Sequence, residues 1–346
     1  MLINDIDVIH DAAHVAQKII SAMARPFKIQ GHDIHISPSI GIGVYPDDGR
    51  DIETLLKNAD VAMYQAKSAG RNNYQFFTRE MTESAFVHLA YENSLRQALD
   101  NAEFLLQYQP QVKVASGSMT GVEALIRWRR PDREIAGPAQ FVPIAEESGL
   151  IVPIGAWVLR AACTQAVAWH NAVGRPLRVS VNVSPLQFRQ RNFVEVVSGI
   201  LQETGIDTAA LELEFTEAAL MHDADAVVVK LRALHDAGVT LTIDAFGTGY
   251  SCLTYLKRFP IDRLKIDQSF VQDIGHDRGA EAIVEAIIGM ARSLRIQTLA
   301  VGVETEEQLA FLRTLGCEDA QGYLFSRPLE AEAVQQRVES ETLHDE

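Results

Sequence analysis

The sequence predicts an α/β chain in which a (β/α)8 TIM-like barrel follows a smaller, partial α/β region. The first observation is that short apolar strands alternate with amphipathic helices from residue 104 onward, over roughly 240 residues, a typical barrel length. The second is that successive strands end in a polar side chain. At residues 241–251, for example, a buried strand delivers Asp244 into a loop that contains Gly247 and Gly249. Chemistry at the mouth of an α/β barrel is presented in this way.

Composition and charge limit the possible functions. The 346 residues are enough for two domains, and 47% of them are apolar, so a sizeable core is available. The formal net charge of −15 argues against a protein that coats nucleic acid by neutralising phosphates. A small phosphate ligand stays compatible with this charge, because a metal ion can bridge carboxylates and phosphates. The 3 cysteines form no CxxC pair, which indicates a reducing, cytoplasmic compartment and no zinc site.

Neither a signal peptide nor a membrane span is expected in this chain. Residues 1–10 have no basic region and no long apolar core. The most apolar window is 149–169, which Pro153 and Arg160 interrupt. Apolar residues recur there at helical spacing, so we predict a buried helix in place of a membrane span.

The first 78 residues read as part of a small α/β domain. Pro26 ends an amphipathic helix, and the alternation of apolar and polar residues around Gly31 predicts a hairpin. The expected elements are a helix at 12–24, a hairpin at 27–36, a strand at 37–45, a turn at 46–49 and a helix at 51–70. A long polar helix at 82–101 is expected to connect this region to the next one.

Two blocks of the N-terminal region resemble a known family. The run from Ser39 to Pro46 and the run from Asn58 to Asn72 resemble the C-terminal half of GGDEF domains, the diguanylate cyclases. The Gly-Gly-Asp/Glu-Glu-Phe hairpin that names the family is absent, so we expect no diguanylate cyclase activity. We interpret residues 1–78 as a GGDEF-like remnant that exposes an apolar face, and residues 79–103 as the connector helix.

The C-terminal region carries the repeated strand and helix pattern. Strands are expected at 105–110, 120–128, 179–183, 211–216, 240–245, 263–266, 298–303 and 320–325. Amphipathic helices lie between them, for example at 223–237 and 280–294. A doubly wound sheet is the alternative architecture, but no Gly-rich phosphate turn follows the first strand, as a dinucleotide fold would require.

The polar strand ends form a coherent set. Ser180, Asn182 and Ser184 share one face of their strand by parity, and Glu212 and Glu214 share one face of the next. Any single one could be a surface acid at the start of a loop, but the succession makes that interpretation poor for the set. Burying several carboxylates together is costly unless a cation neutralises them. Oxygen donors of this kind suit Mg²⁺ or Mn²⁺.

Glu123-Ala124-Leu125 begins a series of blocks that resembles the EAL family of cyclic-di-GMP phosphodiesterases, and residues 104–338 are identified as a member. In that family the barrel hydrolyses cyclic-di-GMP to linear pGpG with two metal ions. The resemblance implies that the first metal is held by Glu123, Asn182, Glu214 and Asp244. It implies catalytic roles for Lys265, Glu217, Gln321 and Glu304, in which Lys265 orients the water and Glu217 steadies the glycine loop. It implies ligand contacts by Gln109, Leu125, Arg127 and Asp267, where the planar fork of Arg127 suits a phosphate or guanine.

Two positions depart from the family pattern. The family has Asp-Asp-Phe-Gly where this chain has Asp244-Ala245-Phe246-Gly247, and Ala-Glu-Gly-Val-Glu where this chain has Val301 in second place. In the resemblance, both lost carboxylates belong to the second metal. We therefore expect one Mg²⁺ or Mn²⁺ site and doubt the second.

Three functions follow from this pattern as alternatives. The first is a signalling receptor that binds cyclic-di-GMP with weak or no hydrolysis. The second is an active phosphodiesterase that works with one metal, or with water and Glu304. The third is a structural module that has lost its ligand. The family resemblance also implies a homodimer through the glycine-loop side, and a receptor implies a further, unidentified protein partner. Nucleic-acid binding has no support, because basic runs are absent.

Overall fold

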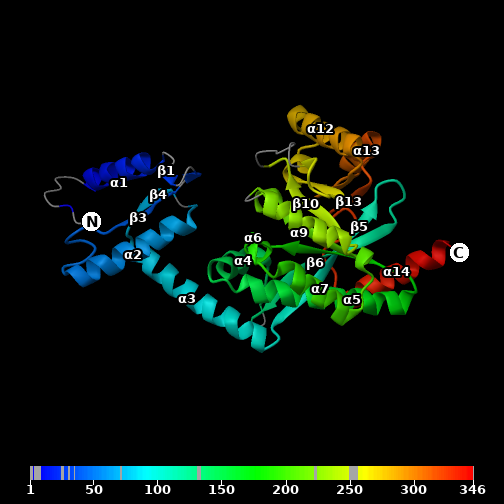
Figure 1. The fold of residues 1–346 in the computed structure, drawn as a ribbon, viewed down its shortest axis with the longest axis horizontal. Coiled ribbons are helices and arrows are strands. Elements are labelled where there is room, and N and C mark those ends of the chain that lie inside the picture. Colours follow the sequence, from blue (N-terminus) through cyan, green and yellow to red (C-terminus); the bar gives the residue numbers. More distant parts are fainter. Residues whose placement is uncertain are drawn as a thin grey trace. The chain divides into compact units, whose positions relative to one another are not determined.

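The structure is a computed structural model that describes residues 3, 9–24, 27–29, 32–34, 36–70, 72–130, 134–221, 224–248 and 256–345. It divides into two compact units, Met1–Asn93 and Ser94–Glu346, which are described separately below (Figure 1). Helix α3 (Arg79–Asp100) contains the boundary between them, where the sequence predicts a connector.

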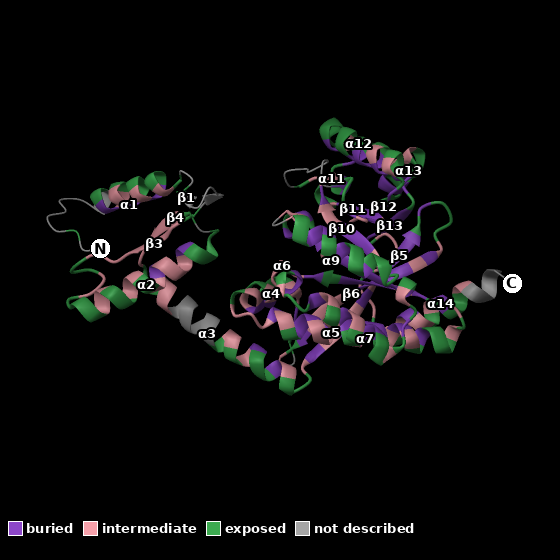
Figure 2. Ribbon diagram, viewed as in Figure 1, coloured by how far each residue is buried: buried purple, intermediate pink, exposed green. Residues whose placement is uncertain are grey.

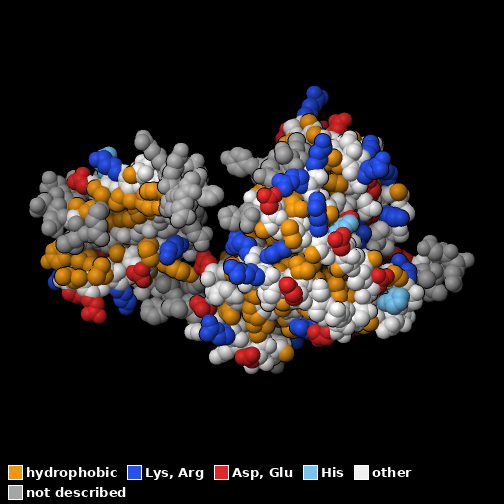
Figure 3. All heavy atoms as spheres, viewed as in Figure 1, with side chains coloured by type: hydrophobic (Ala, Val, Ile, Leu, Met, Phe, Trp, Pro, Cys, Tyr) orange, Lys and Arg blue, Asp and Glu red, His pale blue; other side chains and the backbone are white. Residues whose placement is uncertain are grey.

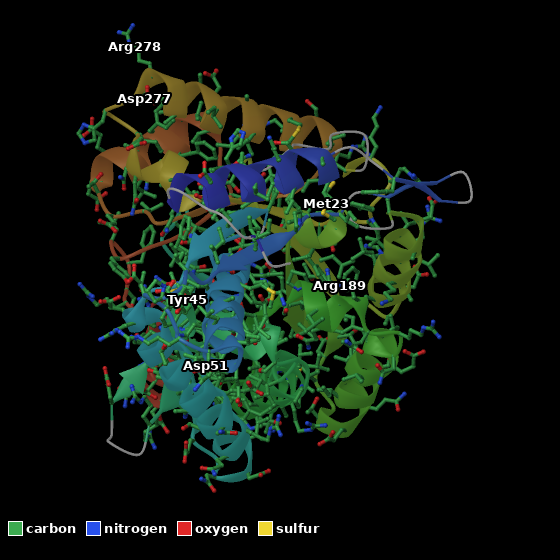
Figure 4. The ribbon with its side chains drawn as sticks, turned by 90° about the vertical axis from the view of Figure 1, so that its left-hand side faces the viewer. Met23, Tyr45, Asp51, Arg189, Asp277 and Arg278 are labelled. Carbon is green, nitrogen blue, oxygen red and sulfur yellow. The ribbon has the colours of Figure 1, made fainter. Side chains whose placement is uncertain are left out.

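The first unit contains the elements predicted from its sequence and one more. Its elements are α1 (Ile9–Met23), β1 (Phe27–Ile29), β2 (His32–Ile34), β3 (Ser39–Ile42), α2 (Ile52–Ser68) and β4 (Asn73–Phe76). Strands β1 and β2 form the predicted antiparallel hairpin, whereas β4, which the sequence analysis missed, pairs in parallel with β3. Asp51 caps α2 by accepting a hydrogen bond from the Thr54 backbone N–H at 2.8 Å. Figure 4 labels Tyr45 and Asp51 on either side of the turn that leads into α2.

Close packing joins the sheet of this unit to its helix, yet apolar side chains stay exposed. A Cβ atom on Gly41 would lie 1.9 Å from the Ala59 carbonyl oxygen, so only glycine lets β3 approach α2 this closely. Tyr45, Ile52 and Leu56 are 67%, 74% and 66% exposed. Figure 3 shows hydrophobic side chains gathered on this unit, in agreement with the expected exposed apolar face.

The second unit is a closed barrel, which confirms the predicted fold class (Figure 1). Within the described residues the strand order is β5-β13-β12-β11-β10-β9-β8-β6, and pairing between β5 and β6 closes it. The strands are β5 (Phe104–Lys113), β6 (Met119–Arg129), β8 (Arg178–Val183), β9 (Leu211–Thr216), β10 (Thr240–Phe246), β11 (Arg263–Ile266), β12 (Gln297–Val301) and β13 (Asp319–Gln321). A short strand β7 (Ile135–Ala136) extends β6 at its edge.

The first barrel strand differs from a regular (β/α)8 repeat. β5 runs antiparallel to both of its neighbours, β6 and β13, whereas the other barrel neighbours pair in parallel. A tight connection at residues 114–118 joins β5 to β6 as a hairpin, which only antiparallel strands allow. The repeated strand–helix units therefore start at β6.

Two strands end earlier than the sequence pattern predicts. β12 stops at Val301 because Gly302 adopts a left-handed backbone with φ of +83°. The Gly302 and Val303 backbone N–H groups then both donate to the Gln321 carbonyl, at 2.8 and 3.1 Å. A Cβ atom on Gly322 would lie 2.0 Å from the Val303 carbonyl oxygen, so only glycine lets the segment after β13 pass this close to the segment after β12.

Helices surround the barrel and bury one face each (Figure 2). They are α4 (Pro138–Glu147), α5 (Ile151–Val173), α6 (Pro185–Arg189), α7 (Phe193–Thr204), α8 (Glu217–Leu220), α9 (Ala224–Asp236), α11 (Gln268–Gln272), α12 (Arg278–Leu294), α13 (Glu306–Leu315) and α14 (Ala331–Asp345), with a 3-10 turn at Thr208–Ala210. Thr305 and Gln308 form a capping box at the start of α13.

Among the described residues, α5 is the helix that is long and apolar enough to cross a membrane, judged by length and composition. Of its most apolar window, 44% is buried within the protein. Its Trp169 Nε1 donates to the Ala331 carbonyl at 3.1 Å, and its Val158 and Ala162 are buried. This packing agrees with the buried helix predicted from the sequence.

Candidate active site at the barrel mouth

Strand ends bring six of the predicted site residues to one face of the sheet. Asn182 in β8 pairs with Glu214 in β9, and Asp244 follows two residues after Thr242, the partner of Glu214 in β10. Because paired neighbours in a sheet point to the same side, these side chains share the interior face near the carboxyl ends of the strands. The other contributors are Glu123 from β6, Lys265 from β11 and Gln321 from β13.

Lys265 lies at the centre of the cluster. Its Nζ is 2.6 Å from Glu214 Oε2, 3.0 Å from Glu123 Oε2 and 3.6 Å from Asp244 Oδ1. The side chain is only 2% exposed. Burial by itself lowers the pKa of Lys265, but the negative charges of Asp244, Glu123 and Glu214 raise it well above its ordinary value. The ammonium group therefore stays charged.

Glu123 is the most completely bonded carboxylate. Its Oε1 accepts from Asn182 Nδ2 at 2.7 Å, and its Oε2 accepts from Gln321 Nε2 at 2.7 Å as well as from Lys265. Gln321 Nε2 also donates to Gln109 Oε1 at 3.0 Å, which ties Gln109 to the group. Burial raises the pKa of Glu123, but the Lys265 charge and the two amide donors outweigh it and bring the pKa below its usual value.

Glu214 is the carboxylate of this cluster whose charged form is disfavoured. Its pKa lies well above the ordinary value, first because it is buried and then because of the charge of Glu123 nearby. Its Oε1 is buried and makes no hydrogen bond with any described residue. An orphaned carboxylate oxygen in such a place is a position that a cation would satisfy.

The donor set fits a hard cation, although the arrangement does not yet form a cage. Glu123, Asn182, Glu214 and Asp244 offer the oxygen atoms that Mg²⁺ or Mn²⁺ prefers. In the described parts of the chain, however, no group of three or more His, Cys, Asp or Glu side chains is placed so that it could hold a metal ion. The Lys265 ammonium lies among the three carboxylates instead. A metal held by these residues would have to move it aside.

The two departures from the family pattern lie beside this cluster. Ala245 is the extra residue of a β-bulge, because the β10–β11 register shifts between Ile243 and Phe246, and its φ is +53°. Val301 ends β12 opposite Gln321 and is half-buried. Neither side chain offers an oxygen atom that a cation could bind.

Comparison with known proteins agrees with this geometry. The EAL domain family matches residues 92–328, and the diguanylate cyclase GGDEF domain family matches residues 1–73. This chain belongs to the EAL family. The resemblance inferred from the sequence is therefore confirmed, including the partial GGDEF region that precedes the EAL domain.

Named relatives and solved structures show the same assignment. The bifunctional diguanylate cyclase/cyclic di-GMP phosphodiesterase MucR of Pseudomonas aeruginosa is 45% identical over 322 residues, which cover 93% of this chain and 47% of MucR. The cyclic di-GMP phosphodiesterase NbdA of the same organism is 43% identical over 327 residues, 94% of this chain and 42% of NbdA. The chain thus spans less than half the length of these relatives. A PaMucR phosphodiesterase complex with c-di-GMP superposes with a TM-score of 0.69 at 45% identity and covers 71% of this chain and 99% of that one.

In the described part of the chain, four further predicted residues of the EAL domain are not joined by hydrogen bonds or ion pairs to the cluster around Lys265. Glu304 is exposed on the loop after β12, where its backbone N–H donates to Gln308 Oε1 at 2.7 Å. Asp267 caps α11 by accepting from the Ser269 backbone N–H at 2.9 Å. Leu125 is half-buried in β6. Glu217 is buried, and neither of its carboxylate oxygens bonds a described residue. Its predicted partner, the glycine loop, includes residues 249–251, which lie outside the described residues.

Arg127 is held by a residue that the sequence analysis did not select. Its Nε donates to Gln107 Oε1 at 2.9 Å, and its Nη1 donates to the Ile126 carbonyl at 3.0 Å. Gln107 Nε2 in turn donates to Glu330 Oε1 at 3.0 Å. Parity along β5 carried the signal, since Gln107 and Gln109 share a face of that strand.

Replacement of Glu214 by Gln should change how stability depends on pH. The pKa of Glu214 is higher in the folded state than in the unfolded state, so the folded protein keeps this proton at pH values where the unfolded chain has lost it. The stability of the parent therefore falls as pH rises from 4.5 through the raised pKa. Glu214→Gln cannot ionise and does not show this fall. In chelator-treated protein, its free energy of unfolding should therefore rise relative to the parent with pH, by about 1.4 kcal/mol for each pKa unit of elevation.

Urea unfolding of the two proteins at several pH values measures this difference. Glu307→Gln on the exposed surface of α13 is the control, for which the difference from the parent should stay constant. A Glu214→Gln variant that loses stability relative to the parent as pH rises would show that Glu214 is an ordinary ionised partner of Lys265.

Proposed function

We propose that this EAL domain binds cyclic-di-GMP and reports it to a partner, with weak or no hydrolysis. The observation that carries the proposal is the intact cluster of Glu123, Glu214 and Lys265 beside two positions that have lost their acids. The MucR complex, at 45% identity, supports cyclic-di-GMP as the ligand class. We further propose that the protein is a cytoplasmic homodimer and that residues 1–78 have no cyclase activity.

Ligand binding rests on groups that the chain supplies itself. Arg127 offers a planar cation for a phosphate or guanine, and its orientation is held by Gln107. Gln109 and Gln321 form a joined amide pair beside Glu123. Lys265 holds positive charge at the centre of the acids, where its ammonium can donate to a phosphate oxygen or to the oxygen of a water molecule. Such ground-state contacts do not depend on a complete catalytic set.

Catalysis depends on the two carboxylates that are absent at Ala245 and Val301. Glu123, Asn182, Glu214 and Asp244 would hold one Mg²⁺ or Mn²⁺ ion, which when bound activates water and neutralises phosphate charge. A second ion would need acids at Ala245 and Val301, and its loss should remove several kcal/mol of transition-state stabilisation. Weak turnover follows, while the ligand site is retained.

An active phosphodiesterase that releases pGpG is the second candidate. It is favoured by the relatives, because MucR and NbdA are both named as cyclic di-GMP phosphodiesterases at 45% and 43% identity. A structural module without ligand has less support, because the polar cluster is retained in full.

Binding without efficient turnover is the expected result for the purified chain. Calorimetric titration with cyclic-di-GMP, with and without Mg²⁺, should give a saturable isotherm. Chromatography after incubation in Mg²⁺ or Mn²⁺ should show little linear dinucleotide. Rapid conversion to pGpG would reject this function in favour of the active enzyme, and the absence of any binding would favour the structural module.

Arg127→Ala should weaken cyclic-di-GMP binding by roughly ten- to a hundredfold, because removing a charged hydrogen-bond partner typically costs about 1.5–3 kcal/mol. The matched control is Arg129→Ala, two residues along β6, where the side chain is exposed. Dissociation constants for the three proteins and their melting curves measure the effect. Equal affinity of the parent and a normally folded Arg127→Ala variant would remove Arg127 from the ligand site.

A further inference from the structure

A second polar layer lies inside the barrel, directly below the candidate site. Barrel interiors are usually filled by Val, Ile and Leu. Here six strands instead place a polar residue two positions below a site residue, on the same face. These pairs, lower member first, are Gln111 and Gln109, Ser180 and Asn182, Glu212 and Glu214, Thr242 and Asp244, Arg263 and Lys265, and Asp319 and Gln321.

Arg263 is the hub of this lower layer. Its Nη1 donates to Gln111 Oε1 at 3.1 Å and contacts Glu212 Oε2 at 3.4 Å, and its Nη2 donates to Asp319. The guanidinium is 1% exposed. It therefore connects β11 with β5, β9 and β13, which are the strands that carry Gln109, Glu214 and Gln321.

The remaining members complete the same network. Arg178 contacts Glu212 at 3.1 Å and Asp319 at 3.3 Å, so two guanidinium groups balance two buried carboxylates. Thr242 Oγ1 donates to Glu212 Oε1 at 2.8 Å, and Gln111 Nε2 donates to Ser180 at 3.3 Å. The layer thus reaches six strands of the barrel and is neutral as a whole.

Stability alone does not explain this layer. Apolar residues of similar volume often replace a buried ionic network with no loss of stability. What the network adds is a specific placement of the strands, because each hydrogen bond fixes the register and rotation of one strand relative to another. We propose that Arg263 is a positioning residue that sets the geometry of Lys265, Glu214 and Gln321 above it. The ligand-affinity part of this proposal rests on the function proposed above.

Arg263→Lys tests the role because it keeps the charge and removes the fork that joins three strands. The first measurement is the ammonium resonance of Lys265 in protein labelled with ¹⁵N-lysine, assigned by its loss in Lys265→Arg. Positioning predicts that this resonance shifts or broadens in Arg263→Lys. The second is the cyclic-di-GMP dissociation constant, which should rise about ten- to a hundredfold, as for supporting groups behind metal ligands. Arg160→Lys, in an exposed pair with Glu203, is the control that should change neither.

Each of the two measurements tests a different claim. An unshifted Lys265 resonance in folded Arg263→Lys overturns the positioning role, whatever the affinity. If the parent itself binds no cyclic-di-GMP, the proposed function fails, and the resonance still decides the role of Arg263. Where Arg263→Lys does not fold, Gln111→Met removes one acceptor of the fork without leaving a buried charge. A Lys265 resonance that moves in that variant supports the proposal, and one that does not move overturns it.

Discussion

The double variant Ala245→Asp/Val301→Glu should hydrolyse cyclic-di-GMP about a hundredfold or more faster than the parent. Each substitution restores one acid that the second metal lacks, and single electrostatic contributors to a transition state are typically worth about a hundred- to a thousandfold. Ala245→Asp or Val301→Glu alone should have little effect, because one acid beside Asp244 does not complete a cation site. The combined gain should exceed the product of the single gains, as expected of residues that act as a unit.

The structure indicates that both substitutions can be accommodated. Ala245 has a φ of +53°, a left-handed conformation that Asp tolerates better than Ala. Val301 is half-buried, so a carboxylate there keeps part of its hydration. The stability loss expected of a fully buried charge should therefore be reduced in Val301→Glu.

Hydrolysis rates of the four proteins at saturating Mn²⁺ decide the question, with melting curves and ligand titration as controls. A double variant that binds ligand and melts normally, yet stays as slow as the parent, would show that the second metal shell is not the missing component. The defect would then lie in the glycine loop after Asp244 or elsewhere in the site.

Lys265→Met should lower the free energy of unfolding by about 3–5 kcal/mol. It removes the ammonium that lies within 3.0 Å of carboxylate oxygens of both Glu123 and Glu214 and leaves these acids buried without a counter-charge. Without the lysine charge, which lowers the pKa of both acids, the folded pKa values of Glu123 and Glu214 should rise, so the loss should grow as pH increases and shrink in acid. Lys113→Met, exposed at the end of β5, is the control and should change stability little.

Urea unfolding in the presence of a chelator measures this effect. Adding Glu214→Gln to Lys265→Met should recover part of the lost stability, because one of the uncompensated acids is then neutral. Addition of Mg²⁺ or Mn²⁺ should also stabilise Lys265→Met if the four predicted ligands bind a cation. A Lys265→Met variant with the parent's stability at neutral pH would mean that the three acids do not depend on this lysine.

Local patterns were enough to predict most of the barrel. Strands such as Leu211–Thr216 and Arg263–Ile266 were predicted with their observed bounds, because runs of apolar residues bounded by polar ends carry a strong signal. β4 was missed because four residues of alternating character carry little periodicity. β12 and β13 were predicted too long, because both strands end where Gly302 and Gly322 bring their two segments into contact. The periodicity within each strand carries no sign of that contact.

By itself, the sequence determined the family, the order of strands and helices, and which strand ends carry polar groups, because these depend on residue type and spacing along one segment. The tertiary structure decided how those groups combine. It reversed β5 against its neighbours, placed Lys265 among three acids, and left Glu304 and Asp267 with roles in loop and helix ends. It also placed Arg263 beneath the site as a link between four strands. The Arg263 contacts join residues more than fifty positions apart, and the closure of the barrel, which no single strand encodes, brings them within hydrogen-bonding distance.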